Sequence, residues 1–294
     1  MNIIKKKIHL TRRSRGVKRS YIVDSGIYFI LLLFGIFMAM PMVYAIMSSL
    51  KPLEELWYFP PRFFVVNPTF KNFKDLFRIM GDSWVPFSRY IFNTIFITTV
   101  GTAGHVFIAS LCAYAMSKHK FPGQNLLFSI VVLSLMFSPA VTQIPNFIIM
   151  SKLRWIDTYK ALIIPAFASS LGLYLMKQFM EQMVPDTVLE AARIDGGSEM
   201  HIFLKIVMPI VKPAWLTLIM FSFQGLWGIS NNAFIRSEQL KPLNNALSQI
   251  LAGGIARAGT GAAATVVMMI VPILIFIITQ SNIIETMSTS GMKD

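Results

Sequence analysis

Six long apolar stretches, separated by clusters of charged residues, dominate the chain. They lie at about residues 25–47, 90–116, 125–150, 160–178, 210–233 and 258–283, and their centres contain no Asp, Glu, Lys or Arg. A helix needs about 20 apolar residues to cross roughly 30 Å of hydrocarbon, and each charged residue at its centre would cost ~2.5–3.5 kcal/mol. The pattern therefore predicts an all-α membrane protein with six transmembrane helices.

The composition supports this prediction. Hydrophobic residues make up 54% of the 294 residues and charged residues 14%, whereas soluble domains average about 25% charged residues. A net charge of +13 could by itself indicate nucleic-acid binding. The apolar stretches leave no basic face on a soluble fold, however, so we expect no nucleic-acid partner. The single cysteine, Cys112, lies inside an apolar stretch, where we expect a small buried side chain.

The distribution of lysine and arginine predicts the orientation in the membrane. The first 24 residues contain eight of these cations and no acidic residue before Asp24. Cytoplasmic segments are enriched in Lys and Arg, so we expect a cytoplasmic N-terminus, and six spans return the C-terminus to the same side. No small-residue cleavage site follows the first apolar stretch, which we interpret as a retained span. This gives a cytoplasmic basic tail at 1–24, a transmembrane domain at 25–283 with a cytoplasmic loop at 179–209, and a cytoplasmic tail at 284–294.

Motifs of enzymes and nucleotide-binding proteins are absent from the sequence. It contains no G-x-x-x-x-G-K-[ST] loop, no H-E-x-x-H pair and no G-x-S-x-G elbow, so we expect no enzyme activity, no bound cofactor and no metal site. The apolar stretches also lack the buried carboxylate that proton- and sodium-coupled carriers usually need. His105 is the one ionisable side chain well inside a stretch. It is either functional or a neutral side chain that hydrogen-bonds between helices.

A polar but compact loop separates the fourth and fifth apolar stretches. Pro185 suits the first turn of a helix, and Asp186 suits its positively polarised end. The pair Gly196-Gly197 would end this helix and permit positive φ. Ser198 can cap a second short helix, which Pro209 limits. The loop therefore predicts a helix, a turn and a second helix on the cytoplasmic side.

This loop resembles the EAA signature of permease subunits in binding-protein-dependent ABC importers. In that family E-A-A is followed by D-G-A, then by an Ile and a Leu-Pro pair. The matching residues are Glu190, Ala191, Ala192, Asp195, Gly196, Ile206 and Pro209, with Gly197 at the usual Ala and Met208 at the usual Leu. The spaced pattern, between two apolar stretches, is more specific than E-A-A alone.

Further motifs resemble the carbohydrate-uptake branch of that family, in particular the smaller permease subunit of the maltose type. They extend over most of the chain from about residue 20. They are Ser49-Leu-Lys51-Pro52, Pro60-Pro61, Asn72-Phe73, Leu76-Phe77, Asn93-Thr94, Ala113-Tyr114-Ala115-Met116, Lys120-Phe121-Pro122-Gly123, Asp157-Thr158-Tyr159 and Ala161-Leu162-Ile163-Ile164-Pro165.

The resemblance implies a fold, a set of partners and a role for the loop. The fold would be a type I ABC importer permease bundle in the bacterial cell membrane. Its activity would be the import of a sugar or an oligosaccharide. Its partners would be a second permease subunit, two ATP-binding subunits and an extracytoplasmic solute-binding protein. ATP and Mg would be used by the ATP-binding subunits, to which the loop would couple. A non-sugar solute, or a secondary carrier that works alone, remain the alternatives.

A candidate substrate pathway follows from the resemblance and from polar residues inside two stretches. Sugars offer hydroxyl groups to amide side chains and ring faces to aromatic ones. The candidates in the third stretch are Ser134, Ser138, Thr142, Gln143 and Asn146, and those around the fifth are Gln224, Trp227, Asn231 and Asn232. The same residues could instead form hydrogen bonds between helices, worth about 0.6 kcal/mol each.

Overall fold

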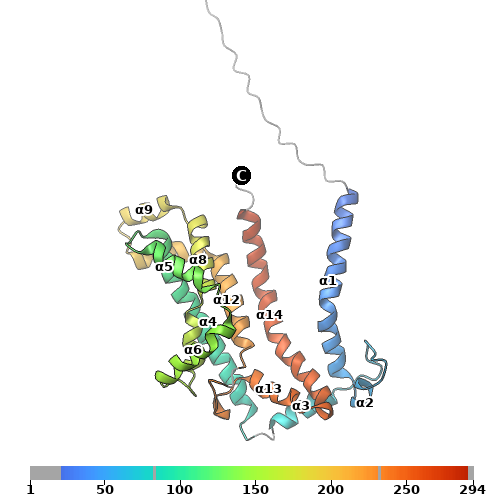
Figure 1. The fold of residues 1–294 in the computed structure, drawn as a ribbon. Helices are drawn as coiled ribbons and strands as arrows, with labels where there is room; N and C mark the ends of the chain where they lie inside the picture. The colour runs from blue at the N-terminus through green and yellow to red at the C-terminus, as the bar shows by residue number, and fades with distance from the viewer. Residues whose placement is uncertain (1–20, 82–83, 231–232, 291–294) are drawn as a thin grey trace, which may run out of the picture. The chain divides into compact units, whose positions relative to one another are not determined.

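The computed structural model describes residues 21–81, 84–230 and 233–290, and every regular element in these residues is a helix (Figure 1). The chain divides into two compact units, residues 1–44 and 45–294. The first contains most of α1 (Tyr21–Leu50), whose side chains from Ile27 to Met42 are exposed. Exposure of so many apolar side chains is expected where lipid surrounds a span. Most of the predicted basic tail, residues 1–20, lies outside the described residues.

The second unit contains the remaining helices. In chain order they are α2 (Leu53–Leu56), α3 (Lys71–Gly81), α4 (Phe87–Lys118), α5 (Gln124–Ser134), α6 (Pro139–Lys152), α7 (Lys160–Phe167), α8 (Ser170–Met183), α9 (Asp186–Ile194), α10 (Glu199–Ile202), the π-helix η1 (Phe203–Val207), α11 (Met208–Ile210), α12 (Lys212–Trp227), the 3₁₀ turn η2 (Glu238–Leu240), α13 (Leu243–Leu251), the 3₁₀ turn η3 (Ile255–Arg257) and α14 (Ala258–Ser290).

Helix α4 is the central element of this unit and packs against α7, α8 and α12. Near its start, Tyr90 joins a core cluster with α3, α13 and α14. Near its end, Ala113 and Tyr114 join a second cluster with α8, α9, η1 and α12. A third cluster, around Ile97, connects it to α7 and the end of α12. Helix α4 therefore connects α13, which packs near its start, to α9, which packs near its end (Figure 1).

Among the residues that the structure describes, four helical segments are long and apolar enough to cross a membrane. They are Asp24–Leu50, Phe87–Lys118, Lys160–Met183 and Ala258–Gln280, and the pair Glu199–Ile210 and Lys212–Trp227, bent by 81°, would make a fifth. An all-helical membrane protein is thus confirmed. The number six stays a prediction, because the stretch at 125–150 is not one helix.

The break in that stretch has a local cause. Helix α5 ends at Ser134, and α6 begins only at Pro139, with Ser138 as its N-cap. The Ser138 hydroxyl accepts a hydrogen bond from the backbone N–H of Ala140 at 3.4 Å. Proline has no N–H to donate to the preceding turn, so it begins a helix more readily than it continues one. The continuous helix expected at 125–150 is therefore replaced by two shorter ones.

One other expectation needs correction. Cys112 is exposed on the surface of α4, although Ala109 and Ala113 nearby on the same helix are buried. Helix α14 runs on to Ser290, and the boundary at residue 284 between the transmembrane domain and the cytoplasmic tail stays a prediction. Residues 291–294 lie outside the described residues.

Candidate functional site

Helix α9 and the turn after it form the predicted helix and turn. The N–H of Gly197 donates to the carbonyl of Ala192 at 3.0 Å, and the N–H of Gly196 donates to the carbonyl of Arg193 at 3.0 Å. Together with a φ of +81° at Gly196, these two bonds make a Schellman motif, which closes a helix C-terminus. A Cβ on Gly197 would lie 2.9 Å from the Ala192 carbonyl oxygen. The turn therefore favours a residue that adopts positive φ at position 196, and a side chain at position 197 would force the backbone to shift.

The second helix of the loop is not a single α-helix. Ser198 caps α10 by accepting from the N–H of His201 at 3.4 Å. The chain then widens into the π-helix η1, where the N–H of Met208 donates to the carbonyl of Phe203, five residues back. Pro209 cannot donate a backbone hydrogen bond, which loosens the α-helical pattern at this point. The 81° bend before α12 follows.

The loop is fastened to the end of α4 by charged side chains. Lys118 donates to Oδ1 of Asp186 at 2.8 Å and to the carbonyl of Val184 at 2.6 Å. Arg193 donates to Oε1 of Glu199 at 2.7 Å. Sequence reasoning counted these charges but did not pair them, since the pairs join residues up to 68 positions apart.

These ion pairs shift pKa values in the loop. Asp186 accepts a hydrogen bond from Lys118, and this bond and the charge of the lysine lower the pKa of Asp186 below its ordinary value. The hydrogen bonds that Glu199 accepts raise the pKa of Arg193 above its ordinary value. Asp186 and Arg193 are therefore both charged at neutral pH, and the links at the two ends of α9 are both present.

One side of the loop is buried in the protein, and the other is exposed. Leu189, Ile202, Phe203 and Val207 belong to the core cluster around the end of α4. The exposed apolar side chains are Val188 (38%), Ile194 (86%), Met200 (53%) and Leu204 (48%). Of the predicted coupling residues, Glu190, Ala191, Asp195, Gly196 and Pro209 are exposed, while Ala192, Gly197 and Ile206 are half-buried. The loop therefore exposes four apolar side chains and most of the predicted coupling residues, while its other side is packed in the core.

The predicted pathway residues occupy different environments. Asn146 lines a cavity of about 270 Å³ together with residues of α7 and the end of α12, among them Pro165 and Leu226. Thr142 and Ser134 are half-buried, while Ser138, Gln143 and Gln224 are exposed. Trp227 is 8% exposed, and its Nε1 donates to the carbonyl of Met268 at 3.0 Å. Trp227 thus forms a hydrogen bond between helices, and its place in the pathway stays a prediction. Asn231 and Asn232 lie outside the described residues.

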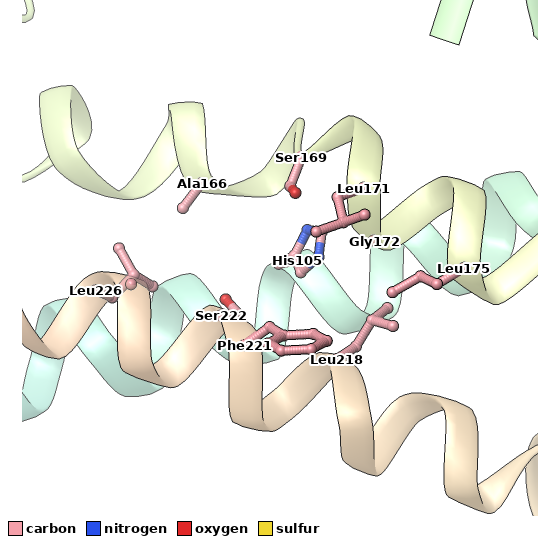
Figure 2. Close-up of a pocket in the computed structure, with 11 residues that line it drawn as sticks. His105, Ala166, Ser169, Leu171, Gly172, Leu175, Leu218, Phe221, Ser222 and Leu226 are labelled. Carbon is pink, nitrogen blue, oxygen red and sulfur yellow. The ribbon is translucent and has the colours of Figure 1, made fainter. Parts of the chain in front are cut away.

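A second cavity, of about 280 Å³, surrounds His105 (Figure 2). Helices α4, α7, α8 and α12 and Ser169, between α7 and α8, line it, and most of its lining is apolar. The Nδ1 atom of His105 lies 3.4 Å from the carbonyl oxygen of Phe167, the last residue of α7. The break between α7 and α8 leaves this carbonyl without a helical partner, and in lipid such groups need one. His105 is thus a hydrogen-bonding residue between helices.

A network at the other end of α4 was missed by the sequence reasoning. Asn93, fully buried, donates to the carbonyls of Gln239 and Lys241 at 2.9 Å each. The Oδ1 atom of Asp157 accepts from the N–H groups of Arg236 and Ser237 at 3.0 and 2.8 Å. These bonds hold the segment 236–241 on α4 and on the residues that precede α7. The sequence signal for this network was the resemblance of Asn93-Thr94 and Asp157-Thr158-Tyr159 to motifs of the family.

Comparison with known proteins identifies the family. Residues 105–288 match the family model described as binding-protein-dependent transport system inner membrane component. The chain belongs to this family. It is therefore a multi-pass inner membrane permease component and not the catalytic subunit of a transporter, as the EAA signature predicted.

Two relatives and one solved structure illustrate the similarity. The polygalacturonan/rhamnogalacturonan transport system permease protein YtcP of Bacillus subtilis is 29% identical over 235 residues, 79% of each chain. The sn-glycerol-3-phosphate transport system permease protein UgpE of Yersinia enterocolitica is 34% identical over 155 residues, 51% of this chain and 55% of that one. A crystal structure of a bacterial ABC transporter involved in alginate import matches in fold, with a TM-score of 0.75, 22% identity and coverage of 88% and 96%.

Proposed function

We propose that this permease is one half of the pore of an ABC importer for a sugar or oligosaccharide, with six spans and both termini in the cytoplasm. ATP hydrolysis is supplied by two separate subunits, substrate is delivered by an extracytoplasmic binding protein, and a second permease completes the pore. The observation that carries the proposal is the loop around α9. It is ordered, anchored on one side, and exposes Val188, Ile194 and Met200 on the other. These exposed apolar side chains, next to the residues of the EAA signature in the chain, would contact the ATP-binding subunit.

Closure of the ATP-binding subunits would move α9 and switch the pore between its inward- and outward-facing states. The coupling residues would be Glu190, Ala191, Ala192, Asp195, Gly196, Gly197, Ile206 and Pro209. Gly196 shapes the turn because it adopts a φ of +81°. The substitution Gly196→Arg should therefore abolish substrate-stimulated ATP hydrolysis and uptake. Unchanged values for both in the reconstituted importer would disprove the coupling role.

Contact with the ATP-binding subunit can be tested directly. Cys112 is replaced by serine, and a cysteine is placed at Ile194, which is 86% exposed. Crosslinking to the purified ATP-binding subunit should give an adduct whose yield changes with ATP. A cysteine at Trp84, which is 87% exposed beyond the far end of α4, should give none. Absence of any adduct at residue 194 in every nucleotide state would contradict the proposal.

The substrate class rests on the carbohydrate-branch motifs and on the relatives. The saccharide permease YtcP aligns with 79% of the chain, whereas two glycerol-3-phosphate permeases named UgpE align with 51% and 67%, so we favour an oligosaccharide over a small phosphorylated solute. Binding of a panel of saccharides and of sn-glycerol-3-phosphate to the cognate binding protein would decide between them. Uptake that persists without the ATP-binding subunits would instead indicate a secondary carrier.

The proposed pathway uses Ser138, Thr142, Gln143, Asn146, Gln224, Trp227, Asn231 and Asn232. Asn146 is its best supported member because its side chain lines a cavity between α6, α7 and α12. Asn146→Ala combined with Gln224→Ala should lower uptake, with Asn125→Ala, near the start of α5, as the control. Trp227→Ala should act mainly on stability, since its indole already bonds to Met268. Unchanged uptake by the double variant would remove Asn146 and Gln224 from the pathway.

A further inference from the structure

The carboxylate of Glu199 joins three parts of the permease. Its Oε1 accepts from Nε of Arg193, on α9, at 2.7 Å. Its Oε2 accepts from the hydroxyl of Tyr114, on α4, at 2.8 Å. The same oxygen lies 3.4 Å from Nε2 of His119, the residue that ends α4. One side chain at the start of α10 therefore connects the last turn of α9 to the last turns of α4.

The connection reaches into the core through Tyr114. This residue is 5% exposed, and its ring packs 5.5 Å from the ring of Phe203 and 5.1 Å from that of His119. Phe203, on η1, is 1% exposed. A buried phenol whose hydroxyl reaches a charged partner is held in one orientation. A displacement of Glu199 would therefore act on a closely packed part of α4.

The first turn of α9 is attached to the same part of α4. Lys118, whose side chain is 5% exposed, forms an ion pair with Asp186 at 2.8 Å. Helix α9 is consequently held on α4 at both ends, by Lys118 at Asp186 and through Glu199 at Arg193. A helix attached at one end can pivot about that end. A helix attached at both ends, such as α9, would move α4 when it moves.

We propose that Glu199 is the positioning residue that transmits movement of α9 to α4 during the transport cycle. The proposal rests on the coupling role proposed above and assigns its mechanical path. From α4 the movement reaches α7, α8 and α12, which pack along it and line the cavities at Asn146 and His105. Glu199 does not belong to the EAA pattern, and its role follows from its three contacts.

The test uses the complete importer in proteoliposomes and measures substrate transported per ATP hydrolysed. Glu199→Ala should lower this ratio at least fivefold, while the crosslink from residue 194 to the ATP-binding subunit persists. Tyr114→Phe, which keeps the ring and removes the hydroxyl, should lower it about twofold. Glu199→Gln, which can still accept from Tyr114, should fall between the two. Glu181→Gln is the control, because Glu181 pairs with Lys177 on its own helix, and it should keep the wild-type ratio.

Double substitution separates transmission from a general loss of structure. If Tyr114 and Glu199 act along one path, Tyr114→Phe with Glu199→Ala should be no worse than Glu199→Ala alone. A wild-type ratio in both Glu199→Ala and Tyr114→Phe would overturn the proposal. So would loss of the crosslink in Glu199→Ala, since the carboxylate would then build the docking surface itself. Absence of the crosslink in the parent protein would instead contradict the proposed function.

Discussion

The hydroxyl of Tyr159 donates a hydrogen bond of 2.6 Å to Oδ1 of Asn93. The amide nitrogen of Asn93 is thereby directed to the carbonyls of Gln239 and Lys241. Thr94 adds a bond of 2.7 Å from the N–H of Leu243 to its hydroxyl. Adjacent residues of α4 thus hold the segment that leads into α13, and neighbouring side chains order a stretch far away in the sequence.

Asn93→Ala should therefore destabilise the permease by about 2–3 kcal/mol, because it removes three hydrogen bonds, two to the carbonyls of Gln239 and Lys241 and one from the hydroxyl of Tyr159. Tyr159→Phe, which removes one hydrogen bond, should cost about 1 kcal/mol. Denaturant or thermal unfolding in detergent measures both. Thr98→Val on the same helix is the control, since the buried Thr98 hydroxyl has no partner among the described residues, and it should be close to neutral. Equal losses in Asn93→Ala and Thr98→Val would contradict this account.

A second prediction concerns the close approach of Gly172 to His105. A Cβ at residue 172 would lie 2.1 Å from Nε2 of the His105 ring, which also contacts the Phe167 carbonyl. Gly172→Ala should thus destabilise the permease by about 1–3 kcal/mol. In the His105→Ala background the same change should cost far less, because the ring is absent.

Gly101→Ala provides the matched control for Gly172→Ala. Its Cβ would meet Cδ1 of Leu226 at 2.5 Å, but that atom is the far end of a flexible side chain and can move. Unfolding in detergent should show a smaller loss for Gly101→Ala than for Gly172→Ala. Strictly additive effects of Gly172→Ala and His105→Ala would show that the ring is not what excludes a larger residue.

The sequence predicted the features that depend on local chemistry. Apolar length placed α4 and α14 within a few residues of their starts, and the pair Gly196-Gly197 predicted the turn after α9. Both signals come from short segments whose physical rules do not depend on the rest of the fold. The EAA spacing added the family, which the comparison with known proteins confirmed.

Features that depend on long-range contacts were not predictable in this way. The apolar stretch at 125–150 hid a break, because apolar composition does not distinguish one span from two shorter helices. Trp227 looked suitable for a sugar, yet its indole bonds to Met268, 41 residues away. The link between Tyr114 and Glu199 joins residues 85 positions apart. Single-sequence reasoning has no rule that brings such residues together.

The third prediction separates the two glycines of the loop. Gly196 needs a positive φ, which asparagine tolerates and valine does not. Gly196→Asn should therefore keep most ATP-dependent uptake in proteoliposomes, and Gly196→Val should lose most of it. Gly197 has a different constraint, because its Cβ would lie 2.9 Å from the Ala192 carbonyl oxygen. Gly197→Ala should cause a moderate loss. Equal uptake by the Asn and Val variants would show that backbone conformation at residue 196 is unimportant.

The last prediction uses the ion pair between Lys118 and Asp186. The hydrogen bond and charge of Lys118 lower the pKa of Asp186, with smaller contributions from Lys120 and Arg193. A carboxyl group with a lowered pKa in the folded protein stabilises it above the unfolded pKa of about 3.9, and this contribution is lost as the pH falls through the lower folded value. The attachment of α9 should thus be complete at neutral pH and weaken only below about pH 4.

A spin label on Thr187, with Cys112 replaced by serine, would report this attachment through its mobility. The label should be restrained at pH 7 and gain mobility as the pH falls below about 4. In Asp186→Asn it should be mobile already at pH 7, because the neutral amide lacks the ion pair, and the two proteins should converge at low pH. Lys118→Gln removes the partner instead and should give the same result at pH 7. A transition of the parent protein above pH 4, absent from Asp186→Asn, would mean that Lys118 does not stabilise the charged carboxylate.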